Sequence, residues 1–103
     1  MRFDFLNFHY MNVLISDLAK HVGDTVTVRG WMYNKRGSGK IYFLQLRDGS
    51  GMAQAVAADG EASNDVMRLA GELQMEASCK VTGTVKKHPK FEDVFELSVT
   101  GIE

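Results

Sequence analysis

The sequence has few of the residues that build disulfide scaffolds or metal centres. Its single cysteine, Cys79, excludes an internal disulfide and a cysteine-rich zinc site. The three histidines, His9, His21 and His88, lack metal-ligand spacing, so we predict no metal site. No apolar run approaches the ~18 residues of a transmembrane helix, so we predict no membrane partner. With 45% hydrophobic and 24% charged residues, the 103-residue chain has the composition of one globular domain.

Catalytic motifs are also missing. Residues 37–40, Gly-Ser-Gly-Lys, resemble the end of a phosphate-binding P-loop, but Asn34 and Ile41 stand where that loop requires Gly and Ser or Thr. No spacing suggests a nucleophile elbow or a Ser–His–Asp triad. A complete ATP-using enzyme typically needs a longer chain. We therefore predict no catalytic residue and no cofactor in this chain.

The N-terminal segment is rich in aromatic residues and poor in targeting signals. The first ten residues, MRFDFLNFHY, lack the basic start, the aliphatic stretch and the cleavage site of a secretory signal. We therefore predict a cytoplasmic protein. Residues 1–12 are interpreted as an N-terminal extension and residues 13–103 as the single domain.

Charge is unevenly distributed, although the net charge is only −1. Two segments, 29–47 and 80–90, contain basic residues and no acid, whereas 49–79 carries five acids against one arginine. Folded together, the basic segments can give one face a field that attracts phosphates. The alternative is a chance imbalance on solvated strands. The predicted phosphate contacts come from the two basic segments: Arg29, Lys35, Lys40, Lys86 and Lys87.

Hydrophobic periodicity predicts five strands and two helices. Alternating residues indicate strands over the segments 25–36, 40–47, 52–57, 77–87 and 93–100. Helical spacing indicates a short helix at 15–22 and an amphipathic helix over 66–73, with Ser63 or Asn64 as its N-cap. Three strands, a helix and two more strands form the order of the five-stranded OB barrel. This all-β Greek-key fold binds oligonucleotides and oligosaccharides on its second and third strands.

The long first strand needs a bend to fit such a barrel. Straight alternation from Val26 and Val28 would bury Arg36. Gly30 is therefore predicted to mark a bulge that re-aims the rest of the strand. Trp31 beside it is expected to pack at the end of the barrel.

Four side chains are predicted to lie outside this core. Phe43 could stack on a base, and Gln54 could hydrogen-bond a base edge. Arg36 could make a bidentate contact with a phosphate or a guanine, and Glu96 could accept hydrogen bonds from a guanine. Each also has a simpler interpretation, in which these are a cross-strand aromatic, a surface glutamine, a solvated arginine and an acid paired with a lysine.

An ordered set of motifs carries a resemblance to a known family. The set comprises Gly30-Trp31, Arg36, Gly39-Lys40-Ile41-x-Phe43, Leu46-Arg47-Asp48-Gly49-x-Gly51, Gln54, Val81-Thr82-Gly83-Thr84-Val85 and Phe95-Glu96-Leu97. Over residues 13–103 the chain resembles the N-terminal anticodon-binding domain of class II aspartyl- and asparaginyl-tRNA synthetases. The segment 33–49 is more similar to the asparaginyl branch.

The resemblance implies a partner and a role for each of these side chains. The partner is the tRNA anticodon loop. By similarity, Phe43 stacks on the central uridine, Gln54 binds the edge of that base, and Arg36 and Glu96 recognise the first base, a guanosine or its modified form. The parent enzyme is expected to be a homodimeric ligase whose catalytic domain, with ATP and Mg²⁺, is absent from this chain. The chain is accordingly interpreted as a fragment or a free-standing relative.

Other functions stay open on the sequence alone. A stand-alone OB protein could bind single-stranded DNA or RNA without sequence choice, and an OB scaffold could serve protein interaction. The four matched positions favour anticodon recognition over the first alternative. Lys86, Lys87 and Lys90 favour a nucleic-acid partner over the second. The equivalent domain of an aspartate–tRNA ligase is the alternative within the family.

Overall fold

Residues 10–91 and 94–103 form five strands and two short helices, in the predicted order. The strands are β1 (Thr25–Ser38), β2 (Ile41–Arg47), β3 (Met52–Ala58), β4 (Ser78–Lys87) and β5 (Phe95–Ile102). A 3-10 helix, η2 (Ile15–His21), precedes them, and an α-helix, α1 (Asn64–Glu72), lies between β3 and β4. Within the part of the chain that the structure describes, neither helix has the length and apolar character needed to cross a membrane.

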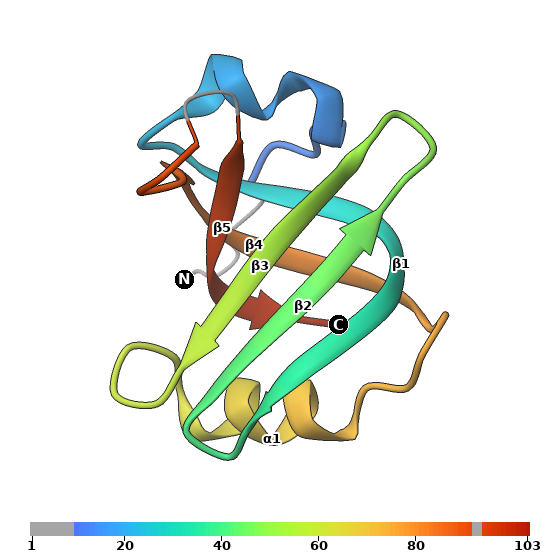
Figure 1. Cartoon of the computed structure of the whole chain (residues 1–103), viewed down its shortest axis with the longest axis vertical. Helices are drawn as coiled ribbons and strands as arrows, with labels where there is room; N and C mark the ends of the chain where they lie inside the picture. The colour runs from blue at the N-terminus through green and yellow to red at the C-terminus, as the bar shows by residue number, and fades with distance from the viewer. Residues whose placement is uncertain (1–9, 92–93) are drawn as a thin grey trace, which may run out of the picture.

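The strands close into a barrel in the order β1-β2-β3-β5-β4 (Figure 1). Neighbouring strands are antiparallel except for β3 and β5, which run parallel. The structure, a computed structural model, describes residues 10–91 and 94–103. Residues 1–9 of the predicted extension, and residue 93 at the predicted start of the fifth strand, lie outside the described residues. The prediction of an all-β OB barrel is confirmed.

The inward faces of the strands form the core. Leu44 and Leu46 of β2 and Leu97 of β5 are almost fully buried. Burial of each such side chain contributes about 1.5–3 kcal/mol to folding. β3 adds three small buried side chains: Ala53, Ala55 and Ala57. Because strand residues alternate between faces, the residues between these core positions point outward.

The bend in β1 does not arise where the sequence predicts it. The register between β1 and β2 shifts between Met32 and Asn34, so the bulge lies at Tyr33 and the prediction of a bulge at Gly30 is wrong. Gly30 is required for a steric reason instead, because a Cβ there would lie 2.2 Å from the carbonyl oxygen of Arg47. Glycine is required where the backbones of β1 and β2 approach this closely. The bulge still has the expected consequence, since it turns Arg36 outward.

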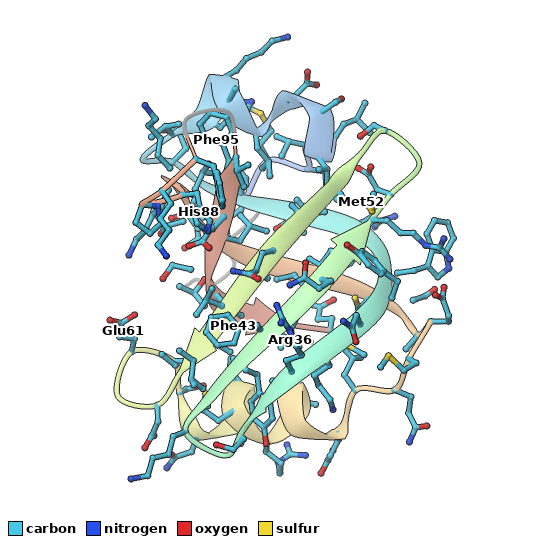
Figure 2. All side chains as sticks on the ribbon, viewed as in Figure 1. Arg36, Phe43, Met52, Glu61, His88 and Phe95 are labelled. Atoms are coloured by element: carbon cyan, nitrogen blue, oxygen red, sulfur yellow. The ribbon has the colours of Figure 1, made fainter. Side chains whose placement is uncertain are left out.

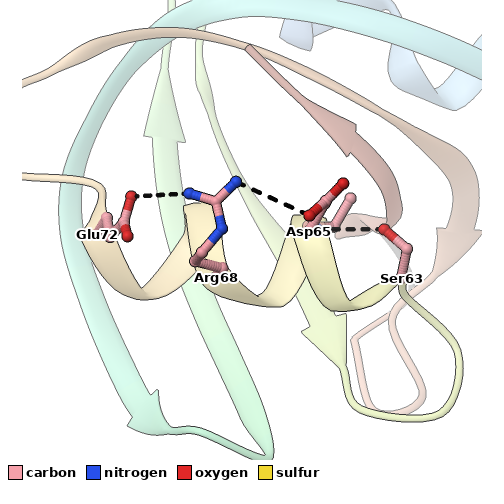
Figure 3. Close-up of polar contacts among 5 residues, drawn as sticks. Ser63, Asp65, Arg68 and Glu72 are labelled. Carbon is pink, nitrogen blue, oxygen red and sulfur yellow. Dashed lines mark hydrogen bonds and ion pairs between the residues drawn. The ribbon is translucent and has the colours of Figure 1, made fainter.

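Helix α1 lies across one end of the barrel (Figure 1). The hydroxyl of Ser63 accepts a hydrogen bond from the Val66 amide at 3.2 Å, which confirms Ser63 as the N-cap. On the outer side of the helix, Arg68 lies 3.8 Å from Asp65 and 3.3 Å from Glu72 (Figure 3). Such exposed pairs stabilise a helix only slightly, so α1 is held mainly by its buried face.

Helix η2 is fixed to the turn between β2 and β3. Its residues Ile15 and Leu18 are buried, and the Ile15 amide donates to Asp48 Oδ2 at 2.9 Å. Partial burial raises the pKa of the Asp48 carboxyl, but hydrogen bonds from Ser50, Ile15 and Gly51 outweigh this effect and leave the pKa below its usual value. The short helix predicted at this position is confirmed.

Part of the predicted extension lies beside β1. The Thr27 amide donates to the Met11 carbonyl at 2.9 Å, and the Val13 amide donates to the Thr27 carbonyl at 2.9 Å. These two bonds join the chain ahead of η2 to the first strand. The domain boundary after residue 12 stays a prediction.

Candidate nucleic-acid interface

The register of the barrel brings the four predicted site residues onto one outward face. Arg36 pairs with Phe43 across β1 and β2, and Gln54 pairs with Glu96 across β3 and β5. Gln45 of β2 pairs with Gln54 and joins the two sets. Side chains at paired positions point to the same side, with Cβ atoms about 4.5–5.5 Å apart in antiparallel pairs. Figure 2 shows Arg36 and Phe43 together on this side of the barrel.

A hollow marks the centre of this face. It is lined by Arg36, Gly37, Phe43, Gln54 and His88, and Phe43 is half-buried in it. The ring therefore lies beside one guanidinium and one carboxamide that can both bind a planar ligand. We call this surface the Phe43 face and define it by the lining residues with Gln45 and Glu96.

Three side chains on the Phe43 face form a hydrogen-bonded relay. Gln45 Nε2 donates to Gln54 Oε1 at 2.6 Å, and Gln54 Nε2 donates to Glu96 Oε2 at 2.8 Å. His88 Nε2 lies 3.8 Å from the same Glu96 oxygen. The Glu96 and His88 side chains are only 18% and 21% exposed, so these contacts are partly shielded from water. The relay links the two residues that the sequence predicts as readers of a base edge.

The sequence-based interpretation missed Gln45 and His88. A signal for Gln45 was present, because the Asp-Gly-Ser-Gly turn at 48–51 pairs Arg47 with Met52 and hence Gln45 with Gln54. No comparable signal existed for His88, which lies in the loop after β4. The antiparallel hairpin of β4 and β5, in which Lys86 pairs with Glu96, brings His88 beside Glu96, and the sequence does not set the register of that hairpin.

A second hollow adjoins the first and extends the face. The two share Gln54 and His88, and the second adds the exposed apolar side chains of Met52, Phe91 and Val94. The rings of His88 and Phe91 lie 5.1 Å apart between centroids. The Phe43 face therefore continues into a more apolar hollow on the far side of Gln54 and His88.

The five basic residues predicted to contact phosphates occupy different places. Lys40 lies in the exposed turn between β1 and β2, and Lys86 and Lys87 lie exposed at the end of β4, where Lys86 pairs in register with Glu96. Arg29 lies on the part of β1 that pairs with β4. The Lys35 ammonium donates to three carbonyls at the end of α1, at 2.8–3.2 Å: Ala70, Gly71 and Leu73. Because its ammonium is engaged there, we leave Lys35 out of the interface.

Another aromatic residue lies outside this face. Trp31 is 44% exposed, so the expectation that it packs at the end of the barrel is wrong. Arg29, Trp31, Lys80 and Glu103 line a hollow of their own, which we call the Trp31 corner. There Lys80 Nζ lies 3.2 Å from a Glu103 oxygen. Arg47, the partner of Trp31 across β1 and β2, forms an ion pair with Glu76.

Comparison with known proteins assigns the barrel to a family. The model of the tRNA anti-codon family, an OB-fold nucleic acid binding domain, matches residues 26–103. This chain belongs to that family. The resemblance noted in the sequence is confirmed, and the Phe43 face lies on the second and third strands, where OB folds bind nucleic acid.

Individual relatives of this tRNA anti-codon domain are aminoacyl-tRNA ligases. Asparagine–tRNA ligase of Sorangium cellulosum is 46% identical over 89 residues, covering 86% of this chain and 20% of the ligase. The crystal structure of asparaginyl-tRNA synthetase from Pyrococcus horikoshii has a TM-score of 0.78 at 30% identity and covers 88% and 21% of the two chains. Aspartyl-tRNA synthetase from Entamoeba histolytica has a TM-score of 0.80 at 26% identity, covering 97% and 22%. The chain spans about a fifth of the length of these relatives.

Proposed function

We propose that this domain recognises the anticodon loop of tRNA for an asparagine–tRNA ligase. One observation carries the proposal: Phe43 lies in an outward hollow beside Arg36 and Gln54, and Gln54 is bonded to Glu96. A stacking ring with hydrogen-bonding groups at its side is what recognition of an unstacked RNA base requires. The 46% identity to an asparagine–tRNA ligase favours asparagine over aspartate.

The central base of the anticodon stacks on Phe43. Stacking of one base on an aromatic side chain contributes about 1–3 kcal/mol, and it tolerates any base because every base has a π-face. Selection therefore needs the neighbouring amide. Gln54 still has a second N–H on Nε2 and a second lone pair on Oε1, which are free to bind the edge of a uridine.

The first base, a guanosine, binds Arg36 and Glu96. A carboxylate accepts hydrogen bonds from the N1–H and N2–H₂ groups of guanine, and a guanidinium donates to its O6 and N7 or to a phosphate. Among the described residues, Arg36 has no ion pair, and Glu96 is bonded to Gln54 and lies near His88. Both groups therefore keep atoms available for the RNA.

Phosphates on either side of these bases contact the exposed lysines. Lys40, Lys86 and Lys87 lie in the segments that border the Phe43 face. Each phosphate that they neutralise in a single strand adds about −0.7 to the slope of log K against log salt. Arg29 pairs with Lys80 on β4 and lines a different hollow, so we assign it to contact with another part of the tRNA.

The ligase activity belongs to the parent protein, as a cytoplasmic homodimer that uses ATP and Mg²⁺. The residues that the structure describes do not fit those cofactors. The described residues contain no group of three His, Cys, Asp or Glu side chains that could hold a metal ion. The P-loop-like segment 37–40 is the end of β1 and its turn into β2, without the helix that a P-loop opens. We therefore derive no catalytic step in this domain.

The test is a titration of the chain with four anticodon stem-loops that differ only at the central base. We expect the tightest binding with uridine. Gln54→Ala should narrow the preference for uridine over cytidine and leave cytidine binding nearly unchanged, because only the uridine contacts are lost. Gln74→Ala is the matched control, since this exposed glutamine lies beyond α1.

Two results would replace the proposal. Equal affinity for all four stem-loops and for unstructured RNA would make the domain a general single-strand binder. An absence of measurable binding to any RNA would instead favour a protein-interaction module on the same scaffold.

A further inference from the structure

The carboxamide of Gln54 cannot by itself distinguish uridine from cytidine. Uracil presents a donor at N3 and an acceptor at O4, whereas cytosine presents an acceptor at N3 and a donor at N4. An amide has one acceptor atom and one donor atom, and rotation by 180° exchanges them. One orientation of Gln54 therefore complements uracil and the reverse orientation complements cytosine. A selective site must hold the amide in one orientation.

The relay fixes which end of the Gln54 amide faces Glu96 and which end faces Gln45. The carboxylate oxygens of Glu96 accept hydrogen bonds, and Gln54 Nε2 donates to one of them at 2.8 Å. Oε1 of Gln54 then faces β2, where Gln45 Nε2 donates to it at 2.6 Å. Rotation of Gln54 would set its oxygen against the Glu96 carboxylate and break both bonds.

Partial burial makes that rotation costly. Gln45 and Gln54 are half-buried, and the side chain of Glu96 is 18% exposed. A polar atom left without a partner in such a place loses more than one that water can reach. The relay therefore holds the orientation before any ligand arrives.

We propose that Gln45 is a positioning residue: with Glu96 it holds the Gln54 amide in the orientation that accepts uridine and rejects cytidine. The inference rests on the proposed function, because it concerns how the same face selects its central base. Gln45 needs no contact with the RNA for this role. What matters is that residue 45 offers a donor to Gln54 Oε1.

The experiment varies the hydrogen-bonding character of residue 45. Gln45→Lys offers only donors, Gln45→Glu only acceptors, and Gln45→Met neither. Each variant and the unmodified chain is titrated with two stem-loops, one with uridine and one with cytidine at the central position. The readout is the ratio of the uridine affinity to the cytidine affinity. A change of charge at residue 45 alters both affinities by the same factor, so its effect cancels in this ratio.

The unmodified chain and Gln45→Lys should prefer uridine equally, by roughly 5–150-fold, the range that one bidentate base contact supplies. Gln45→Glu and Gln45→Met should lower this ratio at least about threefold. In Gln45→Glu the lowering is due to two carboxylates that compete for the same donor. Thermal unfolding shows which variants are folded. The test needs only one folded variant of the pair Gln45→Glu and Gln45→Met.

Two results would overturn the inference and leave the proposed function intact. Undiminished preference for uridine in folded Gln45→Glu or Gln45→Met would show that Gln54 needs no partner on β2. Lost preference in folded Gln45→Lys would show that the size of residue 45 matters and its donor does not. If the unmodified chain itself shows no preference for uridine, the proposed function fails together with the inference.

Discussion

The Phe43 face and the Trp31 corner each combine an aromatic ring, basic residues and a hollow, but they use their polar groups differently. At the Trp31 corner, Lys80 is paired with Glu103, whereas Arg29 has no ion pair among the described residues, as Arg36 has none. At the Phe43 face, Arg36 has no ion pair within residues 10–91 and 94–103, and the Gln54 amide keeps free positions after it joins the relay. An exposed aromatic beside basic residues is therefore not enough to mark a base-recognition site. The proposed site at the Phe43 face differs in having a carboxamide beside the ring, Gln54, with donor and acceptor positions still free.

A change in the shared core should affect both regions together and by the largest amount. Leu44→Ala removes a side chain that is fully buried behind Phe43. We expect a loss of about 2–5 kcal/mol in the free energy of unfolding. Urea denaturation followed by circular dichroism measures this loss. A loss below about 1 kcal/mol would contradict the assignment of Leu44 to the core.

The next largest effect is expected where β1 passes from one region to the other. Gly30→Ala places a Cβ 2.2 Å from the Arg47 carbonyl oxygen, and the two backbones must move apart. Such overpacking typically costs about 1–3 kcal/mol. Thermal unfolding should show a lower midpoint than in the control Gly39→Ala, where an added Cβ meets nothing within 4 Å. Equal unfolding midpoints for the two variants would mean that the backbones of β1 and β2 can move apart at Gly30 without a loss of stability.

Two lysines should separate stability from binding. Lys35→Met removes a cation from the end of α1 and should lower stability by about 1 kcal/mol while leaving RNA affinity unchanged. Lys87→Met should do the reverse, reducing the slope of log K against log salt by about 0.7 with little change in stability. Thermal unfolding and titrations at several salt concentrations measure both. If Lys35→Met changed the salt slope and Lys87→Met did not, Lys35 and not Lys87 would contact the RNA.

The smallest effect concerns the pH dependence of stability. The pKa of Asp48 is lowered in the folded state, so its contribution to stability is complete above the pKa of the unfolded chain. That contribution is lost as the pH falls through the lower folded pKa. Asp48→Asn should therefore flatten the decline of the unfolding midpoint in acid. An unchanged acid profile in this variant would show that the hydrogen bonds from Ile15 and Ser50 do not depend on the charge.

The sequence predicts the outward residues better than it predicts what they touch. Phe43, Gln54 and Glu96 could be placed because strand alternation has a period of two and a buried face fixes it. The bulge at Tyr33 could not be placed, because β1 pairs first with β4 and then with β2, and the register with each is a property of the closed barrel. Lys35 shows the same limit. A surface lysine in a basic segment becomes a helix cap only once α1 is packed across the barrel end.

The most direct test compares the two aromatic residues as stacking platforms. Phe43→Ala should weaken binding of a stem-loop with a central uridine by about 1–3 kcal/mol, and by a similar amount with any other central base. Trp31→Ala, which removes a larger and more exposed ring, should leave that affinity within about twofold of the unmodified chain. Both variants should remain folded, since neither ring belongs to the buried core. Equal losses in the two variants, or a loss in Trp31→Ala alone, would contradict the assignment of base recognition to the Phe43 face.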